Sequence, residues 1–146
     1  MNDTQSIYVL YSSLWDERVP QFASTIKQAL EVQFDLPVHT QNWNYCLEVQ
    51  DILTCFSSKG IIVVMTELLE EQMNYILSRP FERQEDETHQ LKWIWARYLI
   101  DIYSKDRLIG VYYDGADAIE WIPSNQVIYD QSIQQLFSQV QRILDY

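Results

Sequence analysis

Gly60-Ile-Ile-Val-Val-Met-Thr66 places a run of large, mostly β-branched apolar residues between a glycine and a threonine. The run is too short for a free-standing helix and contains no alternating polar residues, so it predicts a strand that is covered on both faces. Amphipathic segments stand just before and just after it, where helices would cover such a strand. We therefore expect the run to form the middle strand of a parallel sheet.

Strand-like and helix-like segments alternate along the rest of the chain. Further strands are expected at 6–11, 36–40, 108–113 and 126–129, and Pro37 favours an edge position for the second of them. The alternation implies right-handed crossovers, for which the simplest strand order is 2-1-3-4-5. The chain is thus predicted to be a single α/β domain over all 146 residues, with a five-stranded parallel sheet and helices on both of its faces.

Apolar residues recur at helical spacing in the segments between these strands, which predicts helix faces that pack on the sheet. In the helix before Gly60, the residues expected to face inward are Cys46, Val49, Ile52, Leu53 and Phe56. In the long helix before the fourth strand, they are Leu91, Ile94, Trp95, Tyr98, Leu99 and Ile102.

The composition excludes several classes of function. The formal net charge of −11 disfavours nucleic acid and anionic membranes as partners. No apolar run reaches the ~18 residues of a membrane span, so direct membrane insertion is not expected. Cys46 and Cys55 would lie ~13 Å apart on one helix by the 1.5 Å rise per residue, too far to bridge each other. The N-terminus does not resemble a signal peptide, and we expect a reducing, cytoplasmic setting.

The sequence offers few groups for chemistry. The chain has three glycines and neither a G-x-G-x-x-G motif nor a P-loop, so no nucleotide cofactor is predicted. His39 and His89 stand apart from each other and from the cysteines, so no metal-ligand spacing is visible. Ser12 and Ser13 follow the first strand, but no base is identifiable for them, and turn chemistry explains them better. No catalytic, cofactor-binding or metal-binding residue is therefore predicted.

The acids are concentrated between Glu67 and Glu87. This segment holds seven acids and two arginines, which gives it a formal charge of −5. One interpretation is a solvated helix and loop, as most charge runs are. The other is a docking surface for a basic partner, from which its own copy would be repelled in a symmetric face-to-face contact. The residues of this candidate surface are Glu67, Glu70, Glu71, Glu82, Glu85, Asp86 and Glu87.

Several segments together resemble a known family. Ile7-Tyr-Val-Leu-Tyr-Ser12, the short strand ending near Trp43, and Ile61-Ile-Val-Val-Met-Thr66 are similar to the start of a Toll/interleukin-1-receptor-type fold, a flavodoxin-like arrangement. Within that superfamily the chain resembles the SEFIR branch, found in interleukin-17 receptors and their cytosolic adaptor. Arg107-Leu-Ile-Gly-Val-Tyr-Tyr113 and Ala118-Ile-Glu-Trp-Ile-Pro123, before a terminal helix, extend the resemblance over nearly the whole chain.

The resemblance implies a cytoplasmic interaction module that associates with other SEFIR-domain proteins to relay interleukin-17-receptor-type signals, with self-association as a further option. The alternative within the superfamily is an NAD-hydrolysing enzyme, whose catalytic glutamate lies on the helix before the fourth strand. Arg97 occupies the nearest matching position, so an enzyme would need Glu67, Glu70 or Glu87 as a displaced acid. A third possibility is a flavodoxin-like domain with neither role.

Overall fold

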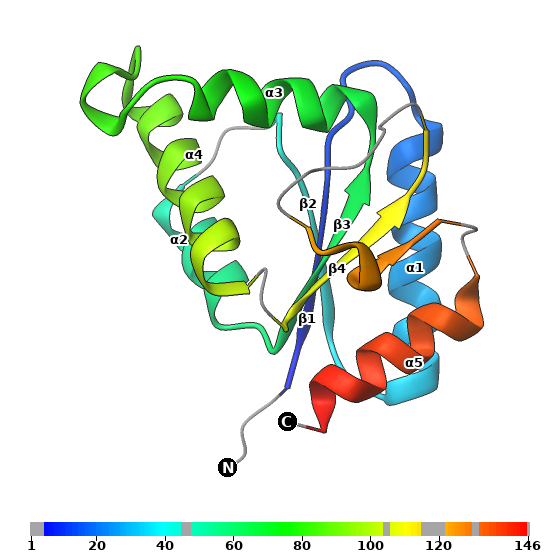
Figure 1. Ribbon diagram of the computed structural model, residues 1–146. Helices are drawn as coiled ribbons and strands as arrows, with labels where there is room; N and C mark the ends of the chain where they lie inside the picture. Colours follow the sequence, from blue (N-terminus) through cyan, green and yellow to red (C-terminus); the bar gives the residue numbers. More distant parts are fainter. Residues whose placement is uncertain (1–4, 45–47, 104–105, 115–121, 130–131, 146) are drawn as a thin grey trace.

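The computed structural model describes residues 5–44, 48–103, 106–114, 122–129 and 132–145 (Figure 1). Helices and strands alternate along these residues, as the sequence predicts. The elements are β1 (Ile7–Tyr11), α1 (Arg18–Phe34), β2 (Val38–Asn42), α2 (Val49–Phe56), β3 (Gly60–Met65), α3 (Glu67–Leu77), η1 (Phe81–Arg83), α4 (Glu87–Tyr98), a π-helical turn η2 (Leu99–Tyr103), β4 (Leu108–Tyr112), η3 (Ser124–Gln126), β5 (Val127–Ile128) and α5 (Ile133–Leu144).

The strands form one parallel sheet in the order β2-β1-β3-β4-β5, which confirms the predicted topology. β3 is the middle strand, and all six of its residues are buried. Its neighbours fix its register, since Ile61 pairs with Leu108 on one side and Tyr8 on the other. β2 lies at an edge, also as predicted.

Helices cover both faces of the sheet and divide the core into two layers. α2, α3 and α4 lie on one face, and α1 and α5 lie on the other (Figure 1). Side chains alternate between the layers along each strand because successive residues of a strand point to opposite faces. Ile61, Val63 and Met65 of β3 enter the first layer, while Ile62 and Val64 enter the second.

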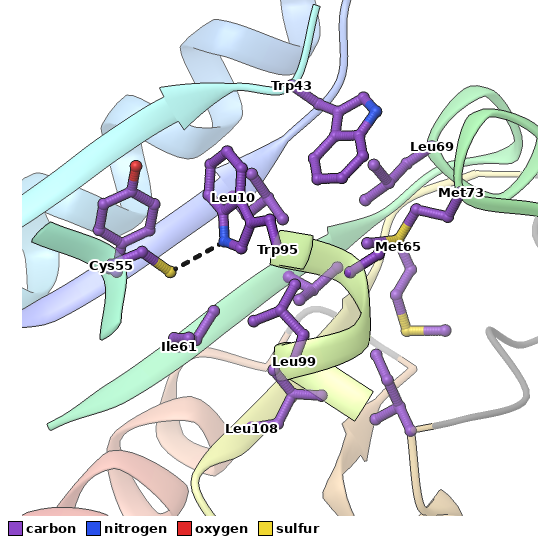
Figure 2. Close-up of a cluster of buried hydrophobic side chains, with 14 of the residues drawn as sticks. Leu10, Trp43, Cys55, Ile61, Met65, Leu69, Met73, Trp95, Leu99 and Leu108 are labelled. Carbon is purple, nitrogen blue, oxygen red and sulfur yellow. Dashed lines mark hydrogen bonds between the residues drawn. The ribbon is translucent and has the colours of Figure 1, made fainter. Parts of the chain in front are cut away.

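The first layer is built around two tryptophans and a cysteine (Figure 2). Trp43 follows β2, and Trp95 comes from α4; their ring centroids are 5.3 Å apart. The indole N–H of Trp95 donates to Cys55 Sγ at 3.2 Å, and burial raises the pKa of the Cys55 thiol to about 12. The prediction that Cys55 is a core residue is thus confirmed, whereas Cys46 lies outside the described residues.

Four residues predicted to face inward are exposed instead. Val49 and Leu53 of α2 are 57% and 54% exposed, and Ile94 and Tyr98 of α4 also reach solvent. The sheet covers only a narrow stripe of each helix, so residues on the flank of that stripe remain outside the core. The rings of Phe56 and Tyr98 stack there with centroids 3.7 Å apart.

Candidate functional site

The chain places β2 on one side of β1 and then β3 on the other, so the topological switch point of the sheet lies between β1 and β3. A cleft lies at the carboxyl ends of these two strands. In open α/β sheets this switch point is where ligands bind, because the loops after the two strands diverge there. The cleft has a volume of about 300 Å³. Its walls come from the loop after β1, from Thr66-Glu67-Leu68 at the start of α3 and from Asp114 after β4.

A network of uncharged side chains fixes the base of the loop after β1. The hydroxyl of Ser12 donates to Gln72 of α3 and accepts from Asn44 Nδ2 at 2.7 Å. Gln72 in turn donates to Asn44 Oδ1, which closes the ring of contacts. Because the Ser12 hydroxyl is buried and bonded on both sides, it is structural, in agreement with its interpretation as turn chemistry.

Asn42 at the end of β2 holds the next residue of the same loop. The backbone N–H of Ser13 donates to Asn42 Oδ1 at 3.2 Å, and Asn42 Nδ2 donates to the Ser13 carbonyl at 3.0 Å. The Ser13 hydroxyl donates to the carbonyl of Asp16 at 2.6 Å, which closes a tight turn. This turn presents Leu14 and Trp15 to solvent, and Trp15 is 91% exposed although it lines the cleft.

The charged side chains that line the cleft are carboxylates. Asp16 pairs with Arg18 at 2.9 Å, and the hydrogen bonds from Arg18 hold the pKa of the Asp16 carboxyl below its usual range. Glu67 and Asp114 are exposed. Glu67 and Asp114 therefore border the cleft beside an exposed indole ring, and the guanidinium of Arg18 is close enough to Asp114 to interact with its charge.

Protein groups already occupy the N-terminus of α3, where an anion would otherwise bind. Thr66 is the N-cap, and its hydroxyl accepts from the backbone N–H of Leu69 at 3.2 Å. The backbone N–H of Glu67 donates to Asp114 Oδ1 at 3.3 Å. A phosphate in the cleft would compete with these acceptors and meet the carboxylates, so the geometry disfavours phosphate-bearing ligands.

The seven acids of the candidate docking surface do not converge on one point. Glu67, Glu70 and Glu71 lie on α3, beginning at the cleft, and Glu71 also lines a second cavity of about 250 Å³ beside Trp43 and Lys92. Glu82 lies in η1 at the far end of α3.

The acids that follow η1 make contacts within their own segment. Glu85 accepts from the Tyr75 hydroxyl and pairs with Arg79 at 3.4 Å. Asp86 is the N-cap of α4 and accepts from the backbone N–H of His89 at 2.9 Å, which lowers the pKa of the Asp86 carboxyl. α4 begins at Glu87, so the prediction of a charged loop over residues 79–88 is right for Asp86, which precedes the helix, and wrong for Glu87.

The remaining chemistry-bearing residues do not gather around the cleft. Arg97 is exposed on α4 and pairs with Asp101 at 3.1 Å. His39 lies on β2, and His89 contacts Asp86 with its ring. Among the residues that the structure describes, no cluster of histidine, cysteine and acidic side chains could hold a metal ion. In the same part of the chain, no helix combines the length and apolar character needed to cross a membrane.

Sequence reasoning missed Trp15 and Asp114, which define the cleft together with Glu67. A signal for Trp15 was present, because a tryptophan in a polar turn directly after a buried strand has no core to enter. Asp114 gave no such signal, since an aspartate before a glycine is ordinary turn chemistry.

No protein-family model and no curated protein match this chain. Among solved structures, it is similar to a diflavin flavoprotein A3 from Nostoc sp., with 11% sequence identity and a TM-score of 0.47. The similarity covers 97% of this chain and 73% of the flavoprotein chain.

The prediction of a function in interleukin-17-receptor-type signalling is corrected, because among solved structures the chain is similar to a flavoprotein. The NAD-hydrolysing alternative is not tested by these comparisons. The resemblance to SEFIR domains and the lack of enzymatic activity stay predictions that these comparisons do not test.

Proposed function

We propose that this protein is a docking domain that receives a positively charged segment of a partner protein in the cleft at the carboxyl ends of β1, β3 and β4. One observation carries the proposal. The indole of Trp15 is exposed at a cleft that is also lined by the carboxylates of Glu67 and Asp114. This combination of an aromatic face and negative charge matches a guanidinium or ammonium group.

The physical basis is the attraction between a cation and an aromatic ring. A cation over a tryptophan face gains ~0.5–1 kcal/mol at an exposed site and ~2 kcal/mol when the pair is desolvated. The side chain of an arginine would lie flat on Trp15 and direct its N–H groups to the carboxylates, since guanidinium donors suit both kinds of partner. The partly buried network of Ser12, Asn44 and Gln72 holds the turn in place, so little ordering is required on binding.

The acidic surface extends beyond the cleft, which favours a peptide segment over a small organic cation. α3 has 11 residues and spans ~16 Å at 1.5 Å per residue. Glu67 lies at its start, Glu71 near its middle, and Glu82 just beyond its end. An extended segment of ~5 residues would cover this length. The charge would also speed the encounter with a basic partner, an effect that weakens as salt rises.

Fluorescence polarisation with a labelled peptide of alternating arginine and serine tests this proposal, with a glutamate–serine peptide as the charge control. We expect the basic peptide alone to bind, and more weakly as salt rises. Trp15→Ser should weaken its affinity ~5–30-fold, which corresponds to the loss of ~1–2 kcal/mol. Glu67→Gln combined with Asp114→Asn should weaken binding and flatten the salt dependence, while Asn keeps the acceptor at the start of α3.

Two matched controls stand outside the cleft. Val32→Ser removes another exposed apolar side chain, from α1, and Asp145→Asn removes an exposed charge after α5, at the opposite end of the sheet (Figure 1). Both should bind the basic peptide as the unmodified protein does. Equal weakening by the cleft variants and the controls, or equal binding of the acidic peptide, would show that the acids are only a solvated surface.

A further inference from the structure

A second site lies on the face of the sheet that α1 and α5 cover, and it shares no lining residue with the acidic cleft. It is a cavity of about 290 Å³ over β4 and β5. Val111 and Ile128 form its floor, Ile26 and Ala29 of α1 form one wall, and Leu136 of α5 forms the other.

The spacing of large and small side chains explains why this cavity exists. Near the C-terminus of α1, Phe34 fills the space between the helices and meets Phe137 of α5 edge-on, with ring centroids 5.8 Å apart. Earlier in α1, the small side chains of Ala29 and Thr25 line the cavity together with the larger Ile26 and Phe22. Phe22 also packs against Tyr113, at 5.0 Å. The two helices are thus held apart at one end, and the described residues leave part of the gap between them unfilled.

The chemistry of the lining excludes charged ligands. Among the described residues, no charged side chain lines the cavity, and the hydroxyl groups of Thr25 and Ser132 already form hydrogen bonds within or next to their own helices. The Thr25 hydroxyl donates to the carbonyl of Gln21 at 3.0 Å, and the Ser132 hydroxyl accepts from the backbone N–H of Gln135 at 3.3 Å. Water gains little in such a space because it needs two to four polar partners.

We propose that this cavity binds a small neutral aromatic molecule of one or two rings. An engineered apolar cavity of ~150 Å³ in another protein stays dry and binds benzene, so a cavity of about 290 Å³ has room for two fused rings. Ile133 borders the cavity and is partly exposed, which gives the ligand a way in from solvent. The size suits one compact molecule and not an amphipathic helix, which would need an apolar groove several turns long.

Titration of the isotope-labelled protein with indole and naphthalene, followed by amide and methyl NMR shifts, tests the proposal. Naphthalenesulfonate serves as the charged analogue. We expect saturable shifts confined to Ala29, Val111, Leu136 and their neighbours for the neutral ligands, and none for the sulfonate at the same concentration. Ala29→Leu should fill the cavity and weaken binding at least 10-fold, with Val32→Leu on the exposed side of α1 as the control.

Thr25→Leu provides a second filling variant at the exposed edge of the cavity, so the test does not depend on one substitution that fails to fold. Scattered shifts, or equal binding of the sulfonate, would mean surface adsorption and overturn the proposal. Sedimentation at increasing protein concentration tests whether a second copy of the chain covers the cavity instead. A dimer that buries Ile133 and is unaffected by indole would assign this face to the second copy and would also overturn the proposal.

Discussion

Trp95 joins α4 to the sheet, and its replacement by alanine is a direct test of the packing described above. The side chain is 0% exposed, meets Tyr8 edge-on with ring centroids 6.1 Å apart and donates its N–H to Cys55. Truncation of a fully buried tryptophan to alanine costs ~3–5 kcal/mol, because contacts are lost and the cavity is only partly refilled. That is a large share of the ~5–15 kcal/mol that stabilises a typical domain.

Trp93 offers a matched control on the same helix. It is half-buried and meets Phe81 of η1 with centroids 5.8 Å apart, so Trp93→Ala removes the same atoms from a place that water already reaches. We expect a loss of ~1 kcal/mol there. For a chain of this size each kcal/mol lowers Tm by ~2–4 °C, which gives a fall of ~6–20 °C for Trp95→Ala and ~2–4 °C for Trp93→Ala.

Thermal and urea unfolding followed by circular dichroism measure both variants. The urea midpoint should fall in the same order as Tm, with an unchanged slope, because neither variant alters the surface exposed on unfolding by much. Equal losses for the two tryptophans would refute the reasoning, since they would mean that Trp95 is no more deeply packed than Trp93.

Val63→Lys buries an unpaired charge in the middle strand and should abolish cooperative unfolding by circular dichroism, whereas Val32→Lys on the exposed side of α1 should melt normally. Burial raises the pKa of the Cys55 thiol to about 12 in the folded protein, so the buried neutral thiol contributes its full stabilisation below pH ~9. This contribution is lost as the pH rises toward 12, because the thiol of the unfolded chain ionises at a lower pH. The stability difference between the unmodified protein and Cys55→Ala should therefore change by up to ~1.4 kcal/mol per pH unit across that interval, and a constant difference would contradict the assignment. Gly110→Ala would place a Cβ 2.6 Å from Met65 Sδ, and urea unfolding should show a loss of ~1–3 kcal/mol.

The candidate site was predicted only in part. The acids of α3 and the following segment were found as a charge run, but the cleft that Glu67 lines was not predicted. It depends on Trp15, Glu67 and Asp114, which come from three separate stretches of the chain and meet only because β1, β3 and β4 end at the same edge of the sheet. Glu87 was placed in a loop, since a charge run does not reveal at which acid the next helix begins.

The sequence alone determined the order and type of the elements and the central place of β3, because the spacing of apolar residues is a local property of each segment. Only the tertiary structure decided which flank of each helix is covered. Val49 and Ile94 share the apolar character of their buried neighbours Ile52 and Trp95, yet they reach solvent. A helix buries the stripe that its neighbours leave room to cover, and the width of that stripe is set by the packing of segments distant in sequence.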